Sequence, residues 1–151
     1  MSEETFLAHA TAVAIAGRAI LLRGPSGSGK SDLALRLIDA GAQLVADDQT
    51  MLSRAGDAIL VRAPASIAGL IETRGVGILR LAAAPIARLA LIADLVAPER
   101  VERLPEPSSE TILGLAIPLV AVAPFEASAP VKLRLALGAA TGDETIAEPR
   151  R

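Results

Sequence analysis

The sequence contains no cysteine, tryptophan or tyrosine, and Phe6 and Phe125 are its only phenylalanines. A chain without cysteine forms no disulfides and no thiolate metal sites, which is typical of a reducing, cytoplasmic setting. So few aromatic rings argue against stacking on nucleic-acid bases. The base of any bound nucleotide is accordingly expected to pack on aliphatic side chains or to protrude.

Strong net charge and long apolar runs are missing as well. The formal net charge of −2 at pH 7 argues against a general nucleic-acid binder. No basic-then-apolar leader opens the sequence, and no uncharged run reaches the roughly 18 residues that a membrane-spanning helix needs. A length of 151 residues is enough for one domain with a hydrophobic core. We therefore expect one cytoplasmic domain over residues 1–140, a disordered tail over 141–151, and neither a membrane nor a nucleic-acid partner.

One glycine-rich stretch carries a strong chemical signal. It fits the Walker A pattern G-x-x-x-x-G-K-[ST] at every required position and runs Gly24, Pro25, Ser26, Gly27, Ser28, Gly29, Lys30, Ser31. The apolar run 19–23 before it is typical of a buried strand, and residues 32–40 after it have the apolar spacing of a helix. A strand, a glycine loop and a helix form the setting in which this motif binds nucleotide phosphates.

Each residue type in the motif has a physical reason. Glycines turn successive backbone N–H groups toward a phosphate, and the N-terminus of the following helix attracts anions. Lys30 supplies a mobile positive charge for the β- and γ-phosphates, and the Ser31 hydroxyl can bind Mg²⁺. Lysine is scarce in this chain, since Lys132 is the only other one and the remaining thirteen basic residues are arginines. A lysine at this position supports a specific role in phosphate binding.

The second candidate feature is a pair of carboxylates, Asp47 and Asp48, at the end of a short strand expected over residues 42–48. Acidic side chains beside a P-loop strand are where P-loop enzymes hold Mg²⁺ or a catalytic base. Successive side chains of an extended chain point in opposite directions, so the two carboxylates need not share a role. Two solvated turn carboxylates are the alternative. The only histidine, His9, is also compatible with a position that carries no chemistry.

The other elements follow from apolar runs and turn residues. Residues 6–16 and 19–23 are expected to form one hairpin, and residues 51–54 and 58–63 a second. Two further strands are expected at 87–96 and 112–122. A short amphipathic helix is expected over 131–140. The segment 72–77 carries charge and two glycines and is expected to be a loop. The proline-bearing segment 98–110 is expected to be a mobile surface loop, a kind of segment that often carries function.

Four features together resemble the catalytic domain of bacterial HPr kinase/phosphorylase, a family that phosphorylates a serine of the small phosphocarrier HPr. They are His9, the Walker A stretch, Val45-Ala46-Asp47-Asp48 and Glu72-Thr73-Arg74-Gly75-Val76-Gly77. The resemblance runs from about Phe6 to Val122 and concerns a short form without the family's N-terminal domain. It implies an α/β fold with a P-loop-containing mixed β-sheet core, a P-loop helix and a C-terminal helix, as in HPr kinase and phosphoenolpyruvate carboxykinase. The pattern departs at Lys132-Leu133-Arg134, where the family usually has a Gly-Arg-Asn turn.

The resemblance also implies roles for the acid–base residues. Asp48 would be the general base toward the acceptor serine and, in the reverse direction, the acid. His9 would pair with Asp47 and tune the charge and orientation of this cluster. Arg103, in the segment 98–110, would matter mainly for dephosphorylation.

For the nucleotide, the resemblance implies ATP and Mg²⁺ as cofactors. Lys30 would neutralise charge on the transferred phosphoryl group, Ser31 would bind Mg²⁺, and Glu72 would complete the metal shell. The implied partner is HPr or an HPr-like phosphocarrier of the phosphotransferase system. The implied assembly is a homo-oligomer, which is a hexamer in the family.

The sequence is interpreted as that of an ATP- and Mg²⁺-dependent serine kinase, with or without phosphorolytic reversal. Two functions of other classes are the alternatives. A nucleotide- or phosphate-sensing module that binds a protein partner without transfer would need the loop but no base. A P-loop kinase for a small metabolite would need basic residues gathered around a closed pocket, whereas the arginines are scattered along this sequence. The combination of His9, Asp47 and Asp48 favours the protein-serine kinase.

Overall fold

Eleven strands and two α-helices make up the part of the chain that the computed structural model describes, residues 5–143 and 146–147. The strands are β1 (Thr5–Ala8), β2 (Ala10–Ile15), β3 (Arg18–Arg23), β4 (Gln43–Ala46), β5 (Thr50–Ala55), β6 (Ala58–Arg62), β7 (Leu70–Thr73), β8 (Gly77–Arg80), β9 (Ala87–Leu95), β10 (Ser108–Ile112) and β11 (Leu115–Val122). The helices are α1 (Lys30–Asp39) and α2 (Ala129–Thr141), and short 3₁₀ turns span Ala65–Ile67 and Pro98–Arg100.

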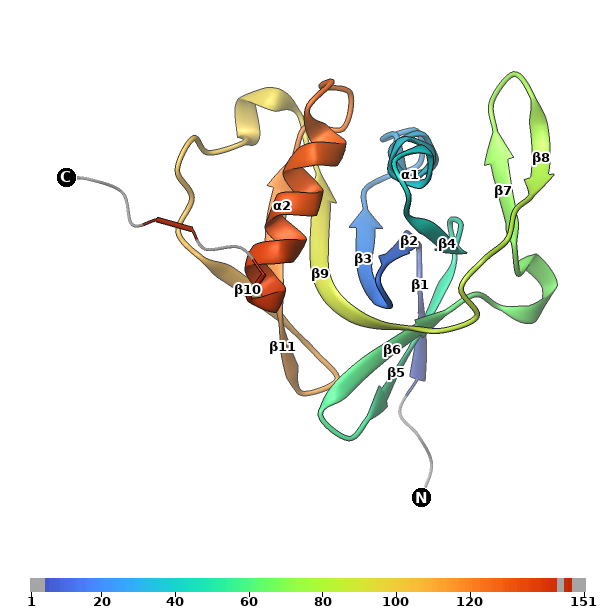
Figure 1. Ribbon diagram of the computed structural model, residues 1–151, viewed down its shortest axis with the longest axis horizontal. Helices are drawn as coiled ribbons and strands as arrows, with labels where there is room; N and C mark the ends of the chain where they lie inside the picture. Colours follow the sequence, from blue (N-terminus) through green and yellow to red (C-terminus); the bar gives the residue numbers. More distant parts are fainter. Residues whose placement is uncertain (1–4, 144–145, 148–151) are drawn as a thin grey trace.

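Nine of the strands form one mixed sheet (Figure 1). Its main order is β1-β5-β6-β9-β3-β2-β4, and β11 lies beside the second half of β9 with β10 as its outer neighbour. β3, β9 and β11 run parallel, whereas the other pairings are antiparallel. β7 and β8 form a separate hairpin that stands beside α1 (Figure 1). The expected α/β fold with a mixed sheet and two helices is therefore confirmed.

The sheet buries apolar side chains on both faces. Along β3, Ile20 and Leu22 join a core cluster that includes α1 and α2, while Ala19 and Leu21 join a second cluster built from strand residues alone. This alternation follows from the period of two in a strand. It explains why the run before the Walker A stretch is apolar throughout, as expected for a strand covered on both sides.

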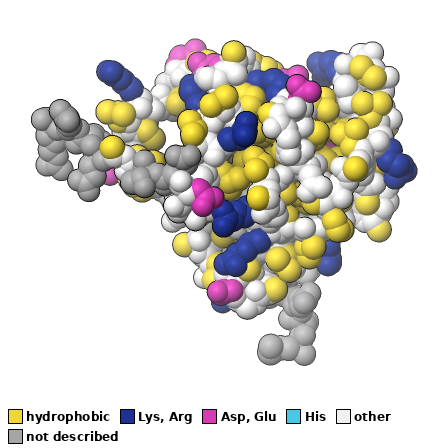
Figure 2. Space-filling model, in the orientation of Figure 1, with side chains coloured by type: hydrophobic (Ala, Val, Ile, Leu, Met, Phe, Trp, Pro, Cys, Tyr) yellow, Lys and Arg dark blue, Asp and Glu magenta, His cyan; other side chains and the backbone are white. Residues whose placement is uncertain are grey.

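Neither helix in the described ranges is long and apolar enough to cross a bilayer. The expected amphipathic helix begins two residues earlier and ends one residue later than predicted, so Thr141 belongs to α2 rather than to a tail. Its outer face is mixed, because Val131 and Leu135 are about half exposed and lie beside the exposed Lys132 and Arg134. Apolar side chains are also exposed over the β7–β8 hairpin (Figure 2). Most of the expected disordered tail, residues 144–145 and 148–151, lies outside the described residues.

Three sequence-based boundaries are wrong. The expected strand 6–16 is two strands, because the chain leaves β5 after Ala8 and joins β3 from Ala10 onward. The expected strand 112–122 is the end of a hairpin whose turn, Leu113 and Gly114, has positive φ angles of 49° and 86°. Such a two-residue turn with both φ angles positive suits a tight hairpin, although leucine seldom adopts it. The hairpin begins at Ser108, so the last three residues of the expected loop 98–110 form strand β10.

The segment 72–77 also differs from the loop expected there. Glu72 and Thr73 end β7, Gly77 begins β8, and the register pairs Glu72 with Ile78. Only the residues between them form the turn. Its charge and glycines therefore mark the tip of a hairpin, and the apolar residues on both sides supply its strands.

An arginine cluster fastens the carboxyl end of β3. Arg23 donates to Asp94 on β9 at 2.8 and 3.1 Å and to Glu110 on β10 at 2.5 and 2.8 Å. The hydrogen bonds from the guanidinium lower the pKa of Glu110 below its ordinary value, and the bonds it donates to Glu110 and Asp94 raise the pKa of Arg23. Since Arg23 immediately precedes Gly24, this cluster fixes the strand end from which the glycine-rich loop begins.

The cluster predicts a pH-dependent contribution to stability. Because the pKa of Glu110 in the folded protein lies below the ordinary value of 4.5, the unfolded chain binds this proton more readily. The stabilisation from this ion pair is therefore complete at pH values above the ordinary pKa of 4.5, and it is lost as the pH falls through the lower pKa of the folded state. In urea unfolding, the midpoint of the native protein should exceed that of Glu110→Gln at neutral pH, and the difference should shrink in acid.

Glu106→Gln is the matched control for this experiment, because Glu106 is exposed and forms no ion pair within the described residues. Its midpoint should follow that of the native protein at every pH. A Glu110→Gln difference that stays constant into acid would show that the ion pair does not contribute.

Candidate active site

The glycine-rich loop occupies the edge of the sheet at which its parallel strands end. β3, β9 and β11 run in the same direction, so the loop after β3 lies at the same edge as the segments that follow β9 and β11 (Figure 1). Ligands of α/β sheets bind outside the carboxyl ends of the strands. The loop leads directly into α1, whose N-cap is Gly29 and whose first turn has no side-chain cap. The N–H groups of this turn are thus left for an anion.

Two glycines of the loop have φ angles that favour glycine. Gly27 has φ 81° and Gly29 has φ 96°. A Cβ atom on Gly29 would also lie 2.9 Å from the ring of Phe125, and one on Gly24 would lie 2.4 Å from Ser28 Oγ. The motif therefore needs these glycines for backbone conformation and for close packing.

Lys30 holds the loop from within. Its side chain is only 8% exposed, and its Nζ donates to the carbonyl oxygens of Gly24 at 2.6 Å and Pro25 at 3.1 Å. An ammonium has three donors, so one remains beyond these two bonds. The buried Ser28 Oγ has no hydrogen-bond partner among the described residues. A loop with unused buried donors fits a bound phosphate.

Asp47 is the centre of the polar contacts beside the loop. Its buried carboxylate accepts hydrogen bonds from Ser31 Oγ at 2.6 Å, Thr11 Oγ1 at 3.2 Å and the backbone N–H of Glu72 at 3.0 Å. It thereby joins α1, β2 and β7. Ser31 and Asp47, both predicted site residues, are in direct contact.

Asp48 lies next to this centre but faces solvent. Its φ of 65° places it in the left-handed region, which non-glycine residues seldom adopt, although Asp tolerates it. Its backbone N–H donates to Thr11 Oγ1 at 3.0 Å. Thr11 Oγ1 therefore bridges Asp47 and Asp48, because it donates to the Asp47 carboxylate and accepts from the Asp48 backbone N–H.

Thr11 did not emerge as a candidate from the sequence. It is fully buried in β2, between Ala10 and Ala12, where a hydroxyl group needs a hydrogen-bond partner. A threonine within an otherwise apolar strand, next to the strand before a Walker A stretch, is the signal that could have identified it.

The structure joins other predicted residues less closely to this centre. Glu72 reaches Asp47 through its backbone, while its side chain is exposed. His9 is exposed at the break between β1 and β2, and no hydrogen bond or ion pair links it to Asp47 in the described part of the chain. Arg103 is exposed in the segment between the second 3₁₀ turn and β10, again without a hydrogen bond to a described residue. Their predicted roles stay predictions.

The donor set fits one hard divalent cation together with a nucleotide. Ser31 and Asp47 offer oxygen atoms, which Mg²⁺ prefers, and Mg²⁺ commonly takes only one or two protein ligands beside phosphates and water. Over residues 5–143 and 146–147 no three acidic, histidine or cysteine side chains form a preassembled metal cluster. The protein part of such a site is therefore small.

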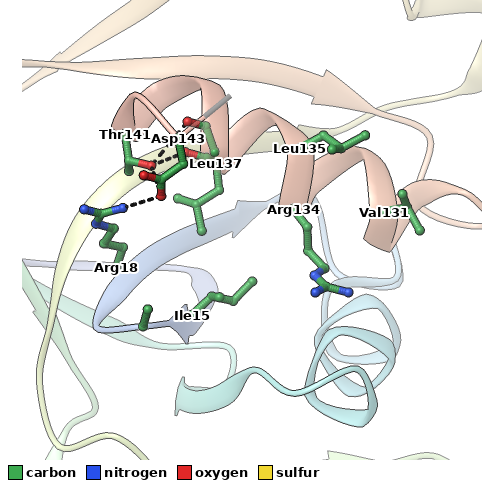
Figure 3. Close-up of a pocket in the computed structure, with 10 residues that line it drawn as sticks. Ile15, Arg18, Val131, Arg134, Leu135, Leu137, Thr141 and Asp143 are labelled. Carbon is green, nitrogen blue, oxygen red and sulfur yellow. Dashed lines mark hydrogen bonds and ion pairs between the residues drawn. The ribbon is translucent and has the colours of Figure 1, made fainter. Parts of the chain in front are cut away.

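A cavity of about 420 Å³ lies elsewhere, between α2 and the turn joining β2 to β3 (Figure 3). Ile15, Leu135 and Gly138 contribute to its wall, and an ion pair of 2.9 Å between Arg18 and Asp143 lies at one side. No residue of the glycine-rich loop lines it. This cavity is therefore separate from the candidate active site.

The position of Thr11 generates a stability prediction. Thr11→Val keeps the shape of the side chain but removes one donor to the Asp47 carboxylate and the acceptor of the Asp48 N–H. Leaving buried polar groups without partners costs about 1–3 kcal/mol. The free energy of unfolding from urea titration should fall by that amount. Thr111→Val, at an exposed position of β10, is the control and should change it little; equal effects of the two variants would contradict the bridging role.

The chain was compared with known families and structures. The family described as HPr Serine kinase C-terminal domain matches residues 1–127. The HPr kinase/phosphorylase of Leptothrix cholodnii is 41% identical over 128 residues, which cover 76% of this chain and 39% of that protein. That of Bordetella pertussis is 37% identical over 125 residues, covering 75% and 41%. The structure of the Hpr(Ser) kinase/phosphatase from Coxiella burnetii matches with a TM-score of 0.74 and 28% identity over 86% of each chain.

The chain spans about two fifths of the length of these curated relatives. The part that matches contains the glycine-rich loop, both aspartates and the β7–β8 hairpin. The sequence match and the shared fold agree, and this chain belongs to the HPr serine kinase C-terminal domain family.

Proposed function

We propose that this domain transfers the γ-phosphoryl group of ATP, with Mg²⁺, to a serine of HPr or an HPr-like phosphocarrier of the phosphotransferase system. The observation that carries the proposal is the 2.6 Å contact between Ser31 and Asp47 beside Lys30, with the exposed Asp48 as the next residue. Phosphate-binding, cation-binding and proton-accepting groups are thus neighbours at one sheet edge. Membership of the family supports the choice of acceptor.

Phosphate binding is the first task of the site. The uncapped N-terminus of α1 presents N–H groups to the phosphates, and the helix dipole adds attraction. Lys30 lies inside the loop and would turn its ammonium from the Gly24 and Pro25 carbonyls toward the β- and γ-phosphates. Positioning and charge neutralisation account for most of the rate enhancement in phosphoryl transfer.

Ser31 and Asp47 would hold Mg²⁺, and Glu72, whose backbone N–H binds Asp47, would complete the metal shell. When bound, the cation supplies charge neutralisation on the phosphates. Thr11 and the Glu72 backbone keep the Asp47 carboxylate in place. The chain therefore fixes the orientation of its cation-binding oxygen atoms before a nucleotide binds.

Asp48 is the proposed base. Its carboxylate faces solvent, where a protein substrate can approach, while its backbone is anchored by Thr11. It would take the proton of the acceptor hydroxyl during transfer. In the reverse reaction, phosphorolysis of the phosphoserine, the same side chain would return the proton, with Arg103 assisting from its exposed loop. His9 and Asp47 would tune this acid–base group.

Asp48→Asn tests the proposed base. The variant should lower phosphoryl transfer by about 100-fold or more, the usual range for loss of an acid–base group, while ATP affinity changes little. Transfer is measured with γ-labelled ATP, Mg²⁺ and the HPr-like proteins of the same organism, and affinity by calorimetry. Asp57→Asn, in the exposed turn between β5 and β6, is the control with the same chemical change.

If the Asp48→Asn variant still transfers labelled phosphate to a serine of a carrier as the native protein does, the assignment of Asp48 as the base is refuted. If the native protein binds ATP but labels no carrier, transfer itself is refuted. The domain would then be a nucleotide sensor that binds a partner.

Lys30→Ala tests the phosphate site. Loss of a charge-assisted contact of about 1.5–3 kcal/mol should weaken ATP binding by roughly 10-fold or more, and transfer should fall as well. Lys132→Ala is the matched control, since Lys132 is the only other lysine and forms a 3.4 Å ion pair with Glu126 on the surface. Calorimetric titration with MgATP measures both variants. Equal affinities of Lys30→Ala and the native protein would exclude the loop as the nucleotide site.

A further inference from the structure

Phe125 is an exposed aromatic side chain at the same sheet edge as the glycine-rich loop. It is 72% exposed, in a chain with only one other phenylalanine and neither tryptophan nor tyrosine. It follows β11, the parallel strand that lies beside β9. Its Cε1 and Cζ atoms lie 2.9 Å from the position that a Cβ atom on Gly29 would occupy. The ring therefore contacts the loop at the residue before Lys30, and most of its surface remains open.

The backbone on either side of the ring is held by α1. Arg36 donates to the carbonyl oxygen of Pro124 and, at 3.2 Å, to that of Glu126, which are the residues on either side of Phe125. The same guanidinium forms an ion pair of 3.0 Å with Asp32, one turn earlier on the helix. Pro124 is buried. Helix, loop and ring therefore form one unit, which argues against a freely moving surface side chain.

We propose that Phe125 packs against the base of the bound nucleotide and contributes to the affinity for it. This rests on the proposed function, because it takes the phosphates to lie in the glycine-rich loop. In a nucleoside triphosphate the ribose separates the phosphates from the base by only a few bonds. A ring in contact with Gly29 is therefore within reach of the base. It differs from the expectation that the base packs on aliphatic side chains or protrudes.

The alternative occupant of the open ring surface is the protein substrate. The contacts favour the base, because the ring rests on the loop itself and its backbone is fastened to α1, the helix that begins at the phosphate site. Stacking of a base on an aromatic side chain is worth roughly 1–3 kcal/mol. That is about a 5- to 150-fold change in affinity.

Phe125→Ala should therefore weaken binding of MgATP about fivefold or more but leave binding of magnesium tripolyphosphate unchanged. Both ligands are measured by calorimetry on the full chain. Phe125→Tyr keeps the aromatic face and should restore ATP affinity, whereas Phe125→Leu should not. Phe6→Ala, at the other phenylalanine in β1, is the matched control and should change neither ligand.

Phe125→Trp adds a spectroscopic test, because it would be the only tryptophan of the chain. ATP should change its fluorescence strongly and tripolyphosphate only weakly. Equal responses to the two ligands would place the ring beside phosphates and away from the base, and would overturn the assignment.

The remaining outcomes separate this proposal from the one on which it rests. If Phe125→Ala weakens ATP and tripolyphosphate equally, the ring acts by shaping the loop and the assignment fails, while the phosphate site stands. If ATP affinity is unchanged and only the KM for the carrier protein rises, the ring binds the carrier and the assignment fails. If the native protein binds neither ligand, the proposed function fails and this assignment with it.

Discussion

The polar part of this structure depends on one buried carboxylate, that of Asp47. A buried charged group is costly unless it is hydrogen-bonded, and Asp47 accepts bonds from β2, α1 and β7. Bonds to a charged acceptor are worth about 1.5–3 kcal/mol each. Three segments far apart in the sequence are thereby held at one point. The helix that carries Ser31 and the hairpin that carries Glu72 are positioned relative to the sheet by the same two oxygen atoms.

Two arginines extend this fixation around the glycine-rich loop. Arg23 ties the strand before the loop to β9 and β10, and Arg36 ties the helix after it to the segment that follows β11. Arg23 divides its donors between two partners and Arg36 among three, which suits the forked shape of the guanidinium. The N–H groups at the start of α1 stay open because no side chain caps this helix. Rigid surroundings with an unfilled loop are what a preorganised anion site requires.

The sequence alone predicted the local parts of the site and missed the contacts between distant parts. The glycine-rich loop could be recognised because its residues are contiguous and its chemistry is local. Thr11 stands 36 residues before Asp47, and Arg36 stands 88 residues before Pro124, so no local pattern announces either contact. The hairpin turn at Leu113 was missed for a different reason. Leucine is a poor residue for positive φ, and pairing of β10 with β11 overrides that preference.

The two neighbouring aspartates show how one backbone angle separates two roles. Asp47 ends an extended segment and points into the protein, where its carboxylate accepts three hydrogen bonds. At Asp48 the chain turns to a φ of 65°, and the next side chain faces solvent. The cost of this conformation is offset by the bond from the Asp48 N–H to Thr11, the residue that also binds Asp47. An exposed carboxylate with a fixed backbone can meet the hydroxyl of an approaching protein, as the proposed base must. Its buried neighbour instead holds α1 and β7 against the sheet.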